Sequence, residues 1–158
     1  MSIRKVLKSK IHGAVVTEVN LDYEGSITID EALMREAGLV EHEKVLVGNI
    51  TNGNRFETYV IKGEEGSGTI GINGAAAHLC NVGDKIIVMS FCYVDDISLL
   101  LHRARVVKVN ERNEITSKTH NYIFNFYFSF PLLATLITTL ALFTFLLILV
   151  LAKLSGLT

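Results

Sequence analysis

The distribution of charged residues is the feature that most constrains the fold of this chain. All 16 acidic residues, and every basic residue except Lys153, lie within residues 1–118 of the 158. Residues 119–152 contain no Asp, Glu, Lys or Arg. Ionised side chains belong on water-exposed surfaces. The chain is therefore expected to divide into a globular segment, 1–118, and a hydrophobic tail, 119–158.

The tail contains a stretch long enough to cross a membrane. Residues 131–152, PLLATLITTLALFTFLLILVLA, are 22 uncharged and mostly apolar residues. A helix of about 20 such residues crosses a hydrocarbon core roughly 30 Å thick. We expect a single transmembrane helix at 131–152, with the preceding basic residues favouring a cytosolic side for the segment before it. The alternative is an aberrant extension, such as a fused or out-of-frame sequence.

Composition narrows the class of protein. The chain has 15 Lys+Arg against 16 Asp+Glu, which argues against a nucleic-acid partner. Cys80 and Cys92 form no disulfide framework. The opening residues, MSIRKVLKSKIHG, are basic and polar and do not resemble a signal sequence. A reducing cytosol is the expected compartment of the globular segment.

The globular segment is expected to be mainly β. Short β-branched and apolar runs separated by turn residues predict strands at 13–19, 26–29, 43–50, 55–61, 68–72, 84–91 and 105–109. An Asn-Gly turn in residues 51–54 predicts a hairpin. Helices are expected at 30–38, between an Asp30 N-cap and Gly38, and at 73–80. Many short strands with two short helices indicate a small, closed or nearly closed barrel.

Several stretches taken in order resemble aspartate 1-decarboxylase, the pyruvoyl-dependent family. They are KSKIH (8–12), YEGSITID (23–30), TNGNRFETY (51–59), GSGTIGINGAAAH (66–78) and VGDKIIV (82–88). The resemblance runs from about residue 3 to residue 115 and leaves the tail outside. It implies a double-psi β-barrel.

The resemblance also implies that the chain cuts itself between Gly25 and Ser26. The Gly-Ser dipeptide alone indicates only a turn. In the family, the fragments would be 1–25 and 26–158, and Ser26 would become a covalent pyruvoyl group. That group would form a Schiff base with L-aspartate, which would lose CO₂ to give β-alanine for pantothenate biosynthesis. Tyr59 would donate the proton to the resulting carbanion.

Further residues match positions of the family that bind substrate. Two cations suit the two carboxylates of aspartate, and small residues let backbone N–H groups approach a ligand. The implied substrate-binding residues are Lys10, Arg55, Thr58, Gly74, Ala75 and Ala76, and the implied supporting residues are Tyr23 and Asn73. No metal site is expected, because the five histidines are scattered. His12 and His78 are assigned no chemical step.

The chain departs from the family in two places. Gly13 stands where relatives usually carry a basic residue, and the tail continues past the end of the family pattern. The resembled enzymes are cytoplasmic homotetramers with active sites between subunits. Whether cleavage needs a maturation factor stays open. The alternatives are a non-maturing, membrane-tethered barrel without catalysis and a pyruvoyl enzyme for another amino acid.

Overall fold

The computed structural model describes residues 2–23, 25–122 and 144. The chain forms two compact units, Met1–Phe124 and Asn125–Thr158. The helix expected at 131–152 lies outside the described residues, apart from Thr144. Within the described residues, no helix has the length and apolar character needed to cross a membrane.

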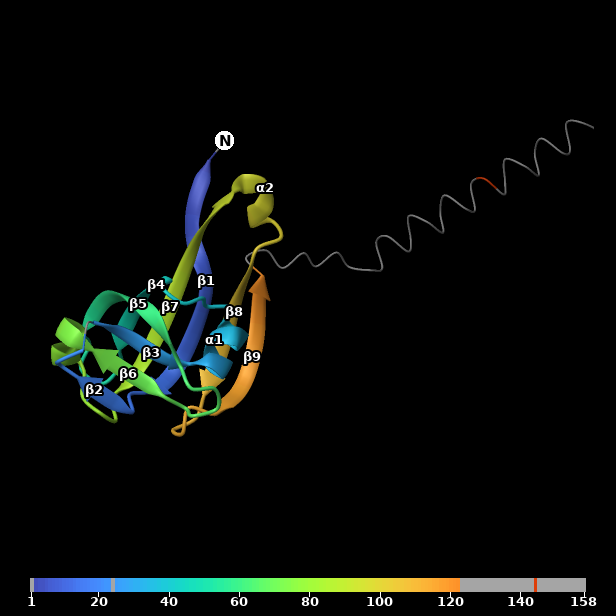
Figure 1. The fold of residues 1–158 in the computed structure, drawn as a ribbon. Helices are drawn as coiled ribbons and strands as arrows, with labels where there is room; N and C mark the ends of the chain where they lie inside the picture. The colour runs from blue at the N-terminus through green and yellow to red at the C-terminus, as the bar shows by residue number, and fades with distance from the viewer. Residues whose placement is uncertain (1, 24, 123–143, 145–158) are drawn as a thin grey trace, which may run out of the picture. The chain divides into compact units, whose positions relative to one another are not determined.

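The first unit is mainly β, as expected (Figure 1). Its strands are β1 (Ile3–Val15), β2 (Glu18–Asn20), β3 (Ser26–Asp30), β4 (Lys44–Asn49), β5 (Arg55–Gly63), β6 (Ile70–Asn73), β7 (Lys85–Asp95), β8 (Arg103–Val109) and β9 (Ile115–Tyr122). The helices are α1 (Glu31–Ala37), the 3₁₀ helix η1 (Gly74–Leu79) and α2 (Asp96–Leu99).

Backbone pairing closes the strands into a barrel. The strand order is β2-β6-β3-β5-β4-β7-β1-β8-β9. β1 and β2 are consecutive in the chain, yet five other strands separate them in this order. The two residues between them complete the circuit, because Val16 N donates to Asp84 O and Thr17 N donates to Ile70 O, each at 2.9 Å. β8 and β9 extend the sheet beyond this closure. The closed barrel agrees with the double-psi fold that the family resemblance implies.

One strand expectation was wrong. The predicted strand 13–19 is divided between β1 and β2. Val16 N donates to Asp84 O, just before β7, whereas Thr17 N donates to Ile70 O of β6, so the pairing partner changes between these two residues. β1 also begins at Ile3, in a stretch that reads as basic and polar. β1 pairs with β7 in antiparallel register, starting with Ile3 opposite Asp95. Backbone pairing therefore forms a strand here that the pattern of apolar residues does not predict.

The local turn and cap predictions are confirmed. The Asp30 side chain accepts a hydrogen bond from Ala32 N at the start of α1, and Gly38 ends the helix with φ +66°. Gly53 has φ +82° in the hairpin between β4 and β5. These positions follow from short-range chemistry, since an aspartate caps orphan N–H groups and glycine tolerates the left-handed region.

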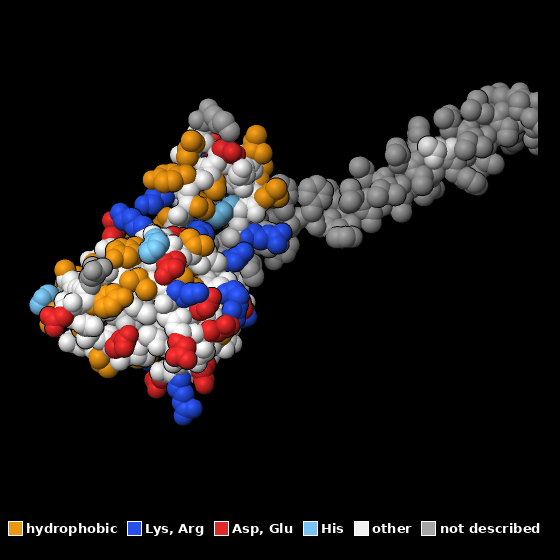
Figure 2. All heavy atoms as spheres, in the orientation of Figure 1, with side chains coloured by type: hydrophobic (Ala, Val, Ile, Leu, Met, Phe, Trp, Pro, Cys, Tyr) orange, Lys and Arg blue, Asp and Glu red, His pale blue; other side chains and the backbone are white. Residues whose placement is uncertain are grey.

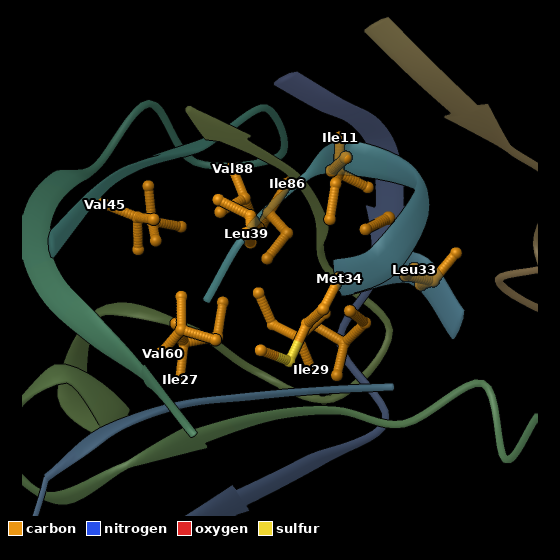
Figure 3. Packing of buried hydrophobic residues seen from close by; sticks show 14 of the residues in the cluster. Ile11, Ile27, Ile29, Leu33, Met34, Leu39, Val45, Val60, Ile86 and Val88 are labelled. Carbon is orange, nitrogen blue, oxygen red and sulfur yellow. The ribbon is translucent and has the colours of Figure 1, made fainter. Parts of the chain in front are cut away.

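Branched aliphatic side chains fill the barrel (Figure 3). Ile27 and Ile29 of β3 are fully buried, as are Ile70 and Ile72 of β6. Since side chains alternate along a strand, the residues between them point away from this core. This alternation places Ser26 and Thr28 of β3 on the outer face of the barrel wall.

The first half of β1 and the end of β7 project beyond the barrel as a two-stranded arm, with α2 at its end (Figure 1). Hydrophobic side chains lie exposed on this arm, including Ile3, Tyr93, Ile97 and Leu101 (Figure 2).

Asp30 connects three parts of the fold. Its buried carboxylate accepts from Ala32 N at 2.7 Å, from Gly66 N at 3.0 Å and from Gly68 N at 2.7 Å. Asp95 offers a comparison, because it caps the exposed helix α2 through Ile97 N and Ser98 N only.

We predict that Asp30→Ala lowers the free energy of unfolding by about 3 kcal/mol, because three backbone donors lose a charged acceptor. Asp95→Ala should lower it by only about 1 kcal/mol, as expected for an exposed cap. Urea unfolding of both variants measures the difference. Equal losses would show that burial of Asp30 adds nothing to its capping role.

Candidate active site

Ser26 lies at the start of β3, between two strands that hold it in register. β3 pairs in parallel with β5 and antiparallel with β6, where Ser26 is opposite Asn73. The side chain is buried, with 1% of its surface exposed. Its φ of +152° lies in a region that residues with a side chain rarely adopt. The backbone at this residue is therefore strained where the chain enters the strand.

The hydroxyl of Ser26 is held by the amide of Asn73. Asn73 Nδ2 donates to Ser26 Oγ at 3.0 Å and to Thr28 Oγ1 at 3.0 Å. An amide NH₂ group only donates, so the serine oxygen is the acceptor. The proton of the Ser26 hydroxyl is not used in this bond and remains available for transfer.

Gly25 and Gly74 form a close contact between backbones. A Cβ placed on Gly74 would lie 2.6 Å from Gly25 Cα, 2.8 Å from Gly25 N and 2.9 Å from the carbonyl oxygen of Tyr23. Gly74 also has φ +63°. Both facts require glycine at this position, because any side chain would collide with the turn before Ser26. The N-terminal end of η1 therefore supports the Gly25–Ser26 peptide.

Tyr59 lies beside Ser26 on the neighbouring strand. The parallel register pairs Ile27 with Val60, so the residues one step earlier are Ser26 and Tyr59. Strand alternation puts Tyr59 on the outer face, opposite to buried Val60. The Tyr59 side chain is 38% exposed and its ring lies 6.1 Å from that of His42, centroid to centroid. The phenol is therefore accessible near the Ser26 end of β3.

The structure does not bring the two predicted substrate cations to Ser26 within one chain. Lys10 is on β1, and β5, β4 and β7 separate that strand from β3. Arg55 is at the start of β5, opposite Gly48, and is exposed. Neither makes an ion pair within the described part of the chain. Both cations are therefore free to meet an anion from outside the chain.

The remaining predicted residues surround the same turn with different exposure. Thr58 is half-buried and lies on the other face of β5 from Tyr59. In η1, Ala75 is exposed and Ala76 packs partly against the core. The Tyr23 side chain is exposed, and its carbonyl faces Gly74.

Two residues near the site were missed in the sequence. Thr28 shares the Asn73 amide with Ser26, and its i+2 spacing from Ser26 on a strand is a signal that places both on one face. His42 contacts Tyr59 from the loop before β4, and no sequence pattern indicates that contact.

The cysteines are poorly suited to nucleophilic chemistry. Burial raises the pKa of the Cys80 thiol, although the hydrogen bond that Asn49 donates to the thiol acts to lower this pKa. Burial likewise raises the pKa of the Cys92 thiol. A thiol with a raised pKa carries little thiolate at neutral pH. Among the described residues, no group of three or more His, Cys, Asp or Glu side chains could hold a metal ion. Ser26 is therefore the side chain best placed for covalent chemistry in the described part of the chain.

Comparisons with known proteins show the family of this chain. The aspartate decarboxylase family model matches residues 1–116. The aspartate 1-decarboxylase of Caldicellulosiruptor bescii is 62% identical over 111 residues, 70% of this chain and 87% of that protein. The aspartate 1-decarboxylase of Kosmotoga olearia is 55% identical over 115 residues, 73% of this chain and 98% of that protein.

These matches place the chain among the lyases, as a decarboxylase. It belongs to the aspartate decarboxylase family.

Two designed proteins of known structure overlap the barrel. The rationally designed protein mkDPBB_sym_86 covers 50% of this chain and 91% of its own, at 14% identity and a TM-score of 0.38. The rationally designed protein mkDPBB_sym1 covers 54% and 96%, at 19% identity and a TM-score of 0.37. Likenesses of this size do not define a fold, and the barrel is defined by its own strand pairing.

We predict that Gly74→Ala destabilises the chain more than Gly53→Ala. Both glycines have positive φ, so each substitution should cost about 1 kcal/mol of backbone strain. Only Gly74 would also collide with backbone, which adds about 1–3 kcal/mol. Urea unfolding is the measurement, with Ser26→Ala present in every chain to keep residues 25 and 26 joined. Equal losses would contradict the close contact with Gly25.

Proposed function

We propose that this chain converts L-aspartate to β-alanine and CO₂, the reaction used for pantothenate biosynthesis, after it cleaves itself between Gly25 and Ser26. The observation that carries the proposal is the buried Ser26 hydroxyl, held by Asn73 at 3.0 Å beside a peptide bond that Gly74 supports. The names of the relatives, aspartate 1-decarboxylase, support the substrate.

The first step is attack of Ser26 Oγ on the carbonyl carbon of Gly25. The new C–O bond forms as the C–N bond breaks, and the hydroxyl proton passes to the freed nitrogen of Ser26. The amide thus becomes an ester. Gly25 has no side chain, and apart from its neighbours in the chain nothing lies within 4 Å of where its Cβ would be. The strained φ of Ser26 supplies a further reason for this bond to react.

The second step releases the upstream fragment. Loss of the Ser26 Cα proton expels the Gly25 carboxylate and leaves a carbon–carbon double bond at residue 26. Addition of water to its imine tautomer releases ammonia and leaves a pyruvoyl group as the new terminus. The residues around Ser26 fit this outcome, since the oxygen is held by a neutral donor and the flanking residue is glycine.

A pyruvoyl group supplies an electrophilic carbonyl that captures the substrate amine and withdraws the electrons left when CO₂ departs. The chain's own side chains do the remaining work. Tyr59 is beside position 26 and accessible, so its phenol is placed to give a proton to the reacting carbon. Asn73 and Thr28 line the same outer face and orient what is bound there.

The substrate carboxylates need cations, and the position of Lys10 supports its supply by a second copy. Lys10 is separated from Ser26 by the width of β5, β4 and β7 in its own chain. We therefore propose a homotetramer in which the β1 face of one subunit completes the Ser26 site of another. The exposed apolar arm, with Tyr93 and Ile97 among its side chains, supports assembly.

The cellular setting follows from this activity. We propose a cytoplasmic catalytic part, residues 1–118 together with the rest of β9 to Tyr122, with the tail at 131–152 acting as a membrane tether. An aberrant extension remains the alternative for the tail, and cleavage is either spontaneous or assisted by a maturation factor. A barrel that fails to mature is the rival without catalysis. The held Ser26 hydroxyl favours the enzyme, since a barrel without chemistry has no need of a strained residue there.

We predict that Ser26→Ala leaves a single chain of 17.5 kDa without decarboxylase activity, because the attacking oxygen is absent. The unsubstituted protein should give two fragments, 1–25 and 26–158, the larger with the mass of a pyruvoyl terminus. Intact-mass spectrometry measures both. Ser9→Ala is the matched control, because Ser9 is also buried but its oxygen has no partner. Full activity of the uncut Ser26→Ala chain would refute the pyruvoyl mechanism.

We predict that Tyr59→Phe matures normally but lowers kcat about 100-fold or more, the scale of a lost general acid. The ring packing against His42 is kept, so the fold should not change. Tyr93→Phe, at an exposed tyrosine of the arm, should match the unsubstituted protein. β-Alanine production by the fully cleaved proteins is the measurement. A Tyr59→Phe enzyme working at the unsubstituted rate would show that another group donates the proton.

A further inference from the structure

His42 has a backbone conformation that residues with a side chain rarely adopt. Its φ is +66°, in the left-handed region. The residue belongs to the loop between Gly38 and β4, where a glycine would hold the same conformation without strain. Strain of this kind persists only where the surrounding structure fixes it, and it gathers at functional sites. The imidazole is the part of the residue that a glycine would lack, so its contacts bear on why histidine stands here.

The loop meets β5 in a two-against-one pairing. His42 N donates to Val60 O at 2.8 Å, and Val60 N donates to Glu43 O at 3.0 Å. Two consecutive loop residues thus lie opposite one residue of β5, as in a β-bulge, and one class of bulge has a glycine in the left-handed region at its first position. The next pair along the ladder is Lys44 opposite Tyr59. Because a bulge re-aims a side chain, the extra residue changes the direction of the His42 ring.

The His42 ring packs against Tyr59. The two ring centroids are 6.1 Å apart and the ring planes are inclined by 49°. Aromatic pairs attract one another at centroid separations of about 4.5–7 Å. The Tyr59 side chain is exposed and points away from the barrel core, so the core does not fix its rotamer. The contact with His42 therefore restricts a phenol that is otherwise free to turn in solvent.

A partly buried ion pair anchors the loop. The Glu43 carboxylate accepts from Lys8 Nζ, at 2.8 Å to one oxygen and 2.7 Å to the other. It also accepts from Val40 N at 3.1 Å and from the Ser90 hydroxyl. Burial raises the pKa of the Glu43 carboxyl, but the hydrogen bonds from Lys8 and Ser90 outweigh it and hold this pKa below its usual value. The carboxylate is therefore ionised at neutral pH, and it ties the loop to β1 and β7.

We propose that His42 is a positioning residue for Tyr59, whose phenol it holds in one orientation by ring packing. The inference rests on the proposed function, in which Tyr59 gives its proton to the reacting carbon. A displacement of about 1 Å at a reacting group can cost about 100-fold in rate. A phenol without the His42 contact spends less time in the productive orientation, so kcat should fall while substrate binding is kept.

The first test uses the full chain carrying Ser26→Ala, which needs neither cleavage nor turnover. Scalar couplings of isotopically labelled tyrosine, measured by NMR, give the χ1 populations of Tyr59 among the staggered wells. One rotamer should dominate, and His42→Asn should spread the population, because asparagine tolerates the left-handed region but has no ring. His42→Phe keeps a ring and should keep the dominant rotamer. Glu41→Gln, at the exposed neighbour in the same loop, is the matched control and should change nothing.

The second test measures the cleaved enzyme. His42→Asn should cleave fully by intact-mass spectrometry yet lower kcat for aspartate about 10-fold, less than the loss of the proton donor itself. KM should change far less than kcat, because the residue does not bind substrate. His42→Phe should recover most of the lost kcat. In a Tyr59→Phe background, His42→Asn should cost nothing more, since residues that act through one another are not additive.

Three results separate the outcomes. Unchanged Tyr59 rotamers in His42→Asn would overturn the proposal, as would a loss of kcat that adds to the loss from Tyr59→Phe. A His42→Phe enzyme that recovers no activity and has a shifted pH profile would assign the imidazole a proton transfer, which also overturns a positioning role. Ordering of Tyr59 by His42 in a chain that never cleaves would uphold the contact while refuting the proposed function.

Discussion

The hydrogen bonds of Val16 and Thr17 are the constraint on which the barrel depends. These two residues lead the chain from β1 to β2, which are seventh and first in the strand order, so that β2 pairs with β6 while β1 pairs with β7. Closure leaves no free edge at β6 and fixes β3 between two partners. Ser26 has little freedom as a result, because its backbone enters a strand that is bonded on both sides.

The site follows from that fixed entry. A strand held on both sides brings Asn73 and Tyr59 to the two flanks of Ser26, one from β6 and one from β5. The turn before the strand must then pass over η1, and only a glycine at position 74 allows it. The chemistry proposed for the Gly25–Ser26 bond thus uses groups that the barrel places through register alone, without a dedicated catalytic loop.

Local chemistry explains which features could be predicted from the sequence. The Asp30 cap, Gly38 and the Asn-Gly turn depend on a few neighbouring residues, and each is where it was expected. The division of 13–19 and the early start of β1 depend on partners 53 to 92 residues away, so no local pattern reveals them. The same holds for the site. The family resemblance names Lys10 and Ser26 together, whereas only the strand order shows that one chain keeps them apart.

The sheet ends at β9, and this has a practical consequence for removing the tail. β9 pairs with β8 from Ile115 to Tyr122, and Lys118 forms an ion pair with Glu36 of α1. A truncation at residue 118 would strip the last four residues of the edge strand and uncover the start of β8. Exposed backbone at a sheet edge is a template for strand addition between molecules. A shortened chain that ends after Phe124 keeps β9 whole and preserves the compact unit.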